Sequence, residues 1–261
     1  MKKLILALAA LLSLTACSGP TPQNDKPVEL HIFAAASLTE TLTEIAEQYQ
    51  ETAPDVTLVF TFDSSGALQS QIEAGADCDL FLSAAQKQMD ALDTSKEGGD
   101  YIDSATRIDL LKNTVVLAVP EGNPAEIHTF EDAASGKVRL IALGNSDVPV
   151  GQYSEEIFTC LGLWDSLNRD HKITFGTNVK EVTSQVSAGA VDCGVVYGTD
   201  AYSAGLTVAA EAPEGSCQPP IYPVAVLKNS AHPEEAAAFL DYLSTDAAVS
   251  VFTSVGFAMA E

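Results

Sequence analysis

Short apolar runs alternate with helical periods along most of the chain. Residues 28–36, VELHIFAAA, predict a strand, and the apolar positions that follow are spaced as on one face of a helix. Those positions are Leu38, Leu42, Ile45, Ala46 and Tyr49. DVTLVFTF at 55–62 and CDLFLSA at 78–84 predict two further strands, and Leu68 and Ile72 mark a helix between them. Strands that alternate with helices predict an α/β fold with a parallel sheet and helices on its faces.

Part of this pattern occurs twice. TFDSSGALQSQIEAGADC, which starts at Thr61, aligns with TFGTNVKEVTSQVSAGAVDC, which starts at Thr174, when two single-residue insertions are allowed. The copies share Thr-Phe, Ser-Gln, Ala-Gly-Ala and Asp-Cys. A match this short also arises by chance. As a true repeat of strand, turn, helix and strand, it predicts two lobes of similar build.

Two Pro-flanked, apolar segments are suited to carrying the chain between these lobes. They are NTVVLAVPEGNP at 113–124 and PPIYPVAVLKNS at 219–230. We therefore assign 28–112 and 224–261 to the first lobe and 113–223 to the second. Two lobes joined by two crossing strands form a hinge, and a hinge creates a cleft.

The junctions between strands and helices offer neutral hydrogen-bond donors. Backbone N–H groups at a helix start lack partners within the helix, and the helix dipole adds partial positive charge, so an oxyanion is held there without Lys or Arg. Ser37 follows the first strand, Ser64 and Ser65 follow the second, and Val150 and Gly151 open a later helix. FGTNVKEV repeats the arrangement in the second copy. Taken singly, each junction is more often an ordinary helix cap or turn than a ligand site.

Tyr197 ends the apolar run GVVY just before a glycine. Its hydroxyl either points into the cleft or reaches water from a half-buried ring, and the pattern does not separate these alternatives.

The first residues have the layout of an export signal. Lys2 and Lys3 precede an apolar run and small residues before Cys17, so residues 1–16 read as a signal peptide. LTAC resembles the bacterial lipoprotein signal, which implies a diacylglycerol on Cys17; the alternative is an ordinary cleaved signal. Residues 17–27 then form a Pro-rich polar tether. We expect a protein outside the cytoplasm that touches the membrane through its lipid only, in a host with one membrane or two.

Charge and motifs narrow the function classes. The formal net charge of −23 repels polyanions, so nucleic acid is not an expected partner. The sequence holds no G-x-S-x-G, H-E-x-x-H or Walker motif, and its four histidines are scattered. Cys78, Cys160, Cys193 and Cys217 lack metal or redox spacing, and their disulfide state stays open.

A set of motifs resembles one known family across nearly the whole chain after the tether. The motifs are FAAASL, SSGALQSQIEAGADCDLFLSA, RIDLLKNTVVLAVP, VPVGQY, VVYGTDA and YPVAVL. Together they resemble the molybdate-binding proteins of bacterial ABC importers. The resemblance implies a two-lobed periplasmic-binding-protein type II fold with a dehydrated tetrahedral oxyanion between the lobes.

Carried over residue by residue, the resemblance implies the ligands of the oxyanion. They are the hydroxyl and N–H of Ser37 and Ser65, the N–H of Val150 and Val179, and the hydroxyl of Tyr197, with Ser64 and Gly151 as additional candidates. The sequence departs from the family where Val150 replaces a common Ala and where DSSG replaces a longer serine run. The second departure leaves open whether Ser64 or Ser65 gives the main hydroxyl.

These observations predict a monomeric receptor that captures molybdate, and tungstate with it, and delivers it to a permease driven by a cytoplasmic ATPase. No cofactor, catalysis or direct metal-ion ligand is expected. One alternative is the same fold binding sulfate or phosphate, and Asp63 beside the serine pair keeps phosphate open because phosphate carries a proton. The other is an extracellular serine hydrolase using Ser65 or Ser37.

Overall fold

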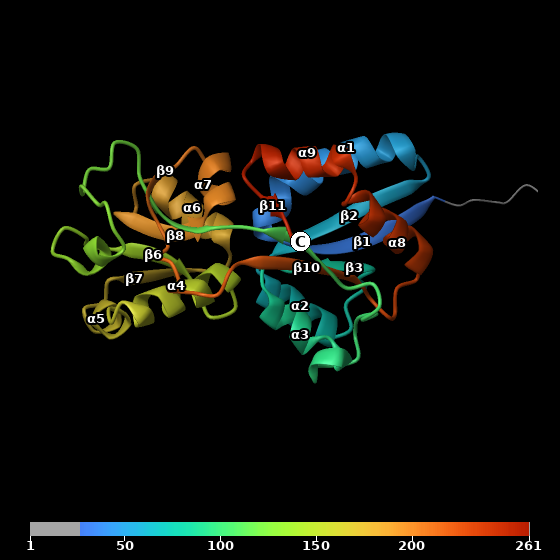
Figure 1. Ribbon diagram of the computed structural model, residues 1–261, viewed down its shortest axis with the longest axis horizontal. Helices are drawn as coiled ribbons and strands as arrows, with labels where there is room; N and C mark the ends of the chain where they lie inside the picture. The colour runs from blue at the N-terminus through green and yellow to red at the C-terminus, as the bar shows by residue number, and fades with distance from the viewer. Residues whose placement is uncertain (1–26, 261) are drawn as a thin grey trace, which may run out of the picture.

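Two lobes, each built on one mixed sheet with helices on its faces, make up the computed structural model, which describes residues 27–260 (Figure 1). The signal peptide, Cys17 and most of the tether lie outside the described residues. The predicted α/β class and two-lobed fold are confirmed. The first sheet contains β1 (Val28–Ala35), β2 (Val56–Asp63), β3 (Leu80–Leu82), β4 (Ile108–Lys112), β10 (Ile221–Val226) and β11 (Ala258–Met259). The second contains β5 (Val115–Val119), β6 (Ile141–Gly144), β7 (Ile173–Gly176), β8 (Cys193–Tyr197) and β9 (Thr207–Glu211).

The two sheets share one topology. Strand order is β2-β1-β3-β10-β4 in the first sheet, extended by β11, and β7-β6-β8-β5-β9 in the second. In each, a parallel trio is followed by an antiparallel neighbour, β10 beside β3 and β5 beside β8. The two copies of the repeated sequence pattern thus occupy matching places, β2 to β3 in one lobe and β7 to β8 in the other.

Helices cover both sheets with apolar faces. The first lobe carries α1 (Thr39–Thr52), α2 (Ser65–Glu73), α3 (Gln86–Ala91), α8 (Pro233–Tyr242) and α9 (Asp246–Ser254). The second carries α4 (Pro149–Cys160), α5 (Trp164–Arg169), α6 (Val179–Ser187) and α7 (Gly198–Ser203). Short 3-10 turns lie at Ala36–Leu38, Thr94–Lys96 and Glu131–Ala134. Along α1, Leu42, Ile45 and Tyr49 are buried, as their spacing predicts.

The C-terminal helices return to the first lobe. Figure 1 shows α8 and α9 beside the N-terminal elements of that lobe, and the ring of Tyr49 on α1 lies 4.9 Å from that of Phe239 on α8. The chain therefore crosses between the sheets at 113–114 and again at 212–220. These crossings place the carboxyl ends of the parallel strands of both lobes opposite each other.

Candidate ligand-binding site

A small pocket lies between the lobes where strand ends and helix starts of both meet. It is lined by Ala35, Ala36, Ser37, Asp63, Ser64, Ser65, Ala84, Val148, Pro149, Val179 and Tyr197. Its cavity volume is about 10 Å³, which is the room that one water-sized sphere needs. The lobes are thus closed on each other, and little room for bulk water remains between them.

Most of the residues singled out in the sequence meet here. Ser37, Ser64, Ser65, Val179 and Tyr197 all line the pocket, although 160 positions separate the first from the last. Val150 and Gly151 do not line it; the neighbouring Val148 and Pro149 do instead. The roles of all these residues in binding stay predictions.

Two helices direct their first turns at this pocket. The Ser64 hydroxyl caps α2 by accepting from the N–H of Ala67 at 3.2 Å, and the Asn178 side chain caps α6 by accepting from Glu181 N–H at 3.1 Å. Ser65 and Val179 are therefore the first residues of matching helices in the two lobes. Within residues 27–260 the backbone N–H groups of both lack an acceptor, as expected at a helix start.

The α4 helix contributes a third such start. Pro149 occupies its first position, where no N–H is needed, and the N–H of Val150 has no acceptor among the described residues. Glycine is required at position 151 for packing. A Cβ at that position would stand 2.3 Å from the carbonyl oxygen of Gly144, so only glycine lets α4 approach β6 this closely.

The Ser65 hydroxyl is oriented by the backbone of the neighbouring loop. Its Oγ accepts from the N–H of Ala84 at 2.9 Å, and the side chain is buried. Since one lone pair is used in this bond, the proton of the hydroxyl remains free to be donated into the pocket. Ala84 was not singled out in the sequence; its place at the end of the third apolar run, 78–84, is the signal that could have identified it.

Tyr197 supplies a neutral donor from the second lobe. It is fully buried, and burial, followed by the neighbouring Tyr222, raises the pKa of its phenol well above the ordinary value. The phenol therefore stays protonated. Its hydroxyl donates to the carbonyl oxygen of Ala84 across the lobe interface, over a long 3.4 Å, and this weak bond is easily exchanged for a better acceptor.

Basic side chains do not contribute to the pocket. Among the described residues that line it, none is Lys or Arg. Lys180, next to Val179, is engaged elsewhere: its Nζ lies 2.7 Å from Glu40 on α1 and 2.9 Å from the buried carboxylate of Asp200 on α7. Burial raises the pKa of Asp200 to about 6 against the opposing effect of Lys180. The ion pair between Lys180 and Glu40 joins the two lobes beside the pocket.

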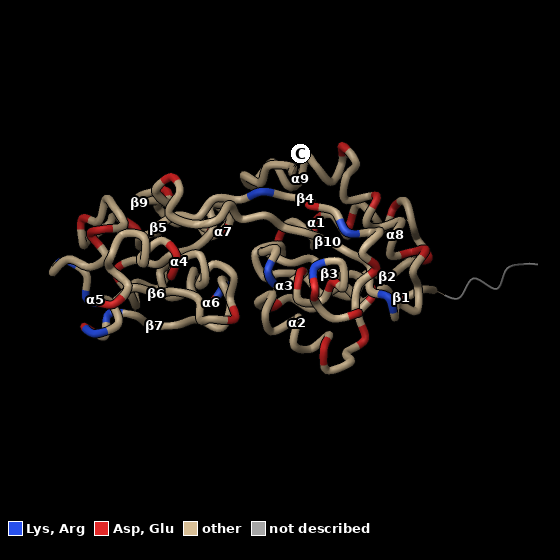
Figure 2. The backbone as a smooth tube through the Cα atoms, turned by 60° about the horizontal axis from the view of Figure 1, so that its bottom comes forward, with Lys and Arg blue, Asp and Glu red and all other residues tan. Residues whose placement is uncertain are grey.

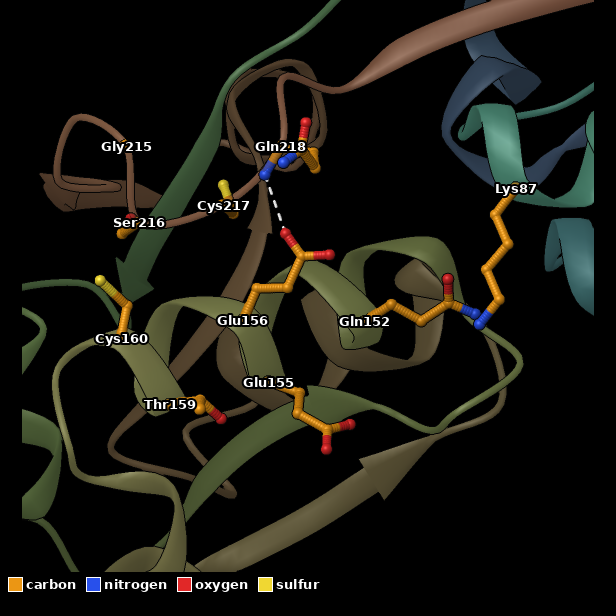
Figure 3. Close-up of a pocket in the computed structure, with 10 residues that line it drawn as sticks. All are labelled: Lys87, Gln152, Glu155, Glu156, Thr159, Cys160, Gly215, Ser216, Cys217 and Gln218. Atoms are coloured by element: carbon orange, nitrogen blue, oxygen red, sulfur yellow. Dashed lines mark hydrogen bonds between the residues drawn. The ribbon is translucent and has the colours of Figure 1, made fainter.

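A larger hollow lies between α4 and the loop before β10 and has a different chemistry (Figure 3). Its volume is about 660 Å³, and Glu155 and Glu156 line it, with Lys87 reaching in from the first lobe. Glu156 accepts from the N–H of Gln218 at 2.8 Å. Two carboxylates against one ammonium disfavour an anion here.

The four cysteines within the described residues are free thiols. Cys160 and Cys217 line the larger hollow, whereas Cys78 and Cys193 are buried in different lobes. Burial raises the pKa of each of the latter two to about 12, so both act as small apolar side chains. No cluster of His, Cys, Asp and Glu within residues 27–260 is placed to hold a metal ion.

Residues 30–258 match the family of bacterial extracellular solute-binding proteins. The chain belongs to this family. A putative ABC transporter substrate-binding lipoprotein of Bacillus subtilis (strain 168), YvgL, is 38% identical over 97% of this chain and 96% of its own. The molybdate-binding protein ModA of Escherichia coli (strain K12) is 37% identical over 88% of each chain. The predicted resemblance is thereby confirmed.

Solved structures agree with this family. The substrate binding domain of a putative molybdenum ABC transporter from Clostridium difficile is 38% identical, covers 90% of this chain and 100% of its own, and superimposes with a TM-score of 0.67. The sulfate-binding protein SubI of Mycobacterium tuberculosis H37Rv, at 15% identity, covers 90% of this chain and 88% of its own with a TM-score of 0.73, and shares the fold alone. The shared fold therefore does not choose among solutes.

Proposed function

We propose that this solute-binding protein captures molybdate, and tungstate with it, in the interlobe pocket and delivers it to an ABC importer. The observation that carries the proposal is a closed pocket whose polar groups are hydroxyls and backbone N–H groups from both lobes, without Lys or Arg among the described lining residues. Hydrogen bonds to a charged acceptor contribute about 1.5–3 kcal/mol each, so several together offset the dehydration of a dianion. Relatives named for molybdate support the choice.

Molybdate and phosphate differ in protonation state near neutral pH. Molybdate and tungstate are fully deprotonated near neutral pH and only accept hydrogen bonds, whereas phosphate carries a proton that needs an acceptor. Asp63 is the only carboxylate among the described lining residues, and one of its oxygens already accepts from Ser64 N–H at 2.7 Å. Sulfate is also deprotonated, but its bonds to oxygen are shorter than those of molybdate, and we propose that donors set for the larger anion hold it less well.

The receptor works by closing. With the lobes apart, each half of the site offers its donors to water; with the lobes together, the same donors converge on one guest. A ligand that contacts both lobes only when they are closed shifts the population toward that state. The permease and its cytoplasmic ATPase then receive the closed, loaded receptor.

A panel of anions tests the ligand assignment. Molybdate and tungstate are expected to raise the Tm in a thermal-shift assay, because a ligand that binds only the native state stabilises it. Sulfate and phosphate at the same concentration are expected to leave it unchanged. Equal shifts with sulfate would redirect the proposal to a general oxyanion receptor, and no shift with any anion would refute it.

Two neighbouring serines are expected to behave differently. Ser65→Ala should weaken molybdate binding at least about tenfold, because one charge-assisted hydrogen bond is lost. Ser64→Ala should instead lower the free energy of unfolding by about 1 kcal/mol through loss of the α2 cap. Calorimetric titration and denaturant unfolding measure the two effects. Reversed results would make Ser64 the ligand.

A substitution at Gly66 tests whether the two lobes must close for molybdate to bind. Its N–H donates to the carbonyl oxygen of Asp147 in the other lobe at 3.0 Å, and a Cβ there would stand 2.4 Å from that oxygen. Gly66→Ala should weaken molybdate binding about fivefold or more, since overpacking costs about 1–3 kcal/mol. The unliganded Tm should stay or rise, because alanine favours α2.

Gly136→Ala is the matched control, because a Cβ at that position meets nothing within 4 Å. Small-angle scattering of both variants with saturating molybdate measures closure. A Gly66→Ala protein that binds and closes like the control would show that this lobe contact does not matter.

We propose further that Cys17, which lies outside the described residues, carries a lipid that holds the receptor at the outer face of the membrane. Within residues 27–260 no helix is long and apolar enough to cross a membrane. A Cys17→Ser chain is expected in the soluble fraction after cell fractionation, with the unaltered chain in the membrane fraction. Equal membrane retention of both would exclude lipidation at this residue.

A further inference from the structure

Ser37 is linked to a buried chain of hydrogen bonds that leads away from the pocket. Its Oγ lies 3.0 Å from the hydroxyl of Tyr222 on β10, and that hydroxyl accepts from Asn113 Nδ2 at 3.2 Å. Asn113 Nδ2 also donates to Thr199 Oγ1 on α7 at 2.8 Å. All four side chains are buried, and Tyr222 and Asn113 were not singled out in the sequence.

Counting protons fixes the direction of the bonds that Asn113 makes. Asn113 Oδ1 accepts from the N–H of Thr114 at 2.9 Å, which identifies the opposite atom of the amide as the nitrogen. Both hydrogens of that nitrogen are used, one on Thr199 and one on Tyr222. The phenol oxygen of Tyr222 therefore accepts from Asn113, and Ser37 Oγ, 3.0 Å away, is an acceptor within reach of its single proton. In the arrangement that we infer, Ser37 Oγ accepts this proton and the proton of Ser37 itself is free for the pocket.

We propose that Tyr222, held by Asn113, is a positioning residue that turns the Ser37 hydroxyl proton toward the bound anion. This inference rests on the proposed function and names the part of the chain that sets donor direction. A serine hydroxyl otherwise rotates among three staggered positions and can accept as readily as donate. Locked in this way, Ser37 offers a donor only, as a fully deprotonated guest requires.

Ser65 supports the same reading. Its Oγ also accepts from a protein donor, the N–H of Ala84 at 2.9 Å, and its proton is likewise released to the pocket. Ser37 and Ser65, the two serines that the family resemblance implies as ligands, thus each have one lone pair occupied by a protein donor in this arrangement. At Ser65 the backbone fills it, and at Ser37 the phenol of Tyr222 does so.

A double-mutant cycle tests the proposal by calorimetric titration with sodium molybdate. Tyr222→Phe is expected to weaken binding about threefold or more, because the hydroxyl of Ser37 then populates about three rotamers instead of one. In a Ser37→Ala background the same change should have no effect, since the group that Tyr222 orients is gone. Tyr153→Phe, which removes a buried phenol that does not line the pocket, should bind molybdate like the unaltered chain.

An equal loss from Tyr222→Phe with and without Ser37 would overturn the proposal, because it would mark a purely structural effect. Unchanged affinity of Tyr222→Phe, or of Ser37→Ala alone, would overturn it as well. Should Tyr222→Phe fail to fold, Asn113→Ala replaces it in the same cycle with the same expectations. If the unaltered chain binds no anion, the proposed function fails first, and the two failures are thereby distinguished.

Discussion

Hydrogen-bond donors that have no acceptor inside the protein are the constraint on which the structure of the pocket depends. The N–H groups of Ser65 and Val179 face no acceptor among the described residues, and the serine hydroxyls have protons to spare. Burying such a donor unpaired costs about 1–3 kcal/mol. Closure on an empty pocket is therefore penalised several times over, and closure on an acceptor-only guest removes the penalty. In the proposed function the same groups therefore select the guest and favour closure of the lobes.

The acidic surface repels an anion, whereas the donors of the pocket attract it, and the repulsion acts over a longer distance than the hydrogen bonds. Acidic positions are spread over both lobes (Figure 2), and the formal net charge of the chain is −23. This field repels an approaching dianion, but salt screens it over about 8 Å at physiological ionic strength. Neutral donors act only at hydrogen-bond distance, so the field of the surface charges does not prevent them from binding the anion. Capture by direct hydrogen bonds thus remains compatible with a surface whose charge keeps the protein soluble.

Local sequence patterns predicted the features that depend on residues close together in the chain, namely the strands, the helices and their starts. The strand and helix periods gave the two sheets, and the repeated segment placed Ser65 and Val179 at equivalent helix starts. The network behind Ser37 could not be predicted, because Tyr222 lies 185 positions away and meets it only through the return of β10 to the first lobe. Gly151 was an additional ligand candidate because it stands at a helix start, and its close packing against Gly144 could be seen only in the structure.

The two lobes are built alike but contribute donors of different kinds, and this difference decides where extra residues are needed. The second lobe offers Val179, whose N–H is fixed by the helix itself, and Tyr197, whose rigid ring leaves its hydroxyl little freedom. The first lobe offers serine hydroxyls, which rotate freely unless a donor occupies their oxygen. Supporting bonds are accordingly found behind Ser37 and Ser65. A site made of neutral donors thus depends as much on the groups that hold its protons in place as on those that touch the guest.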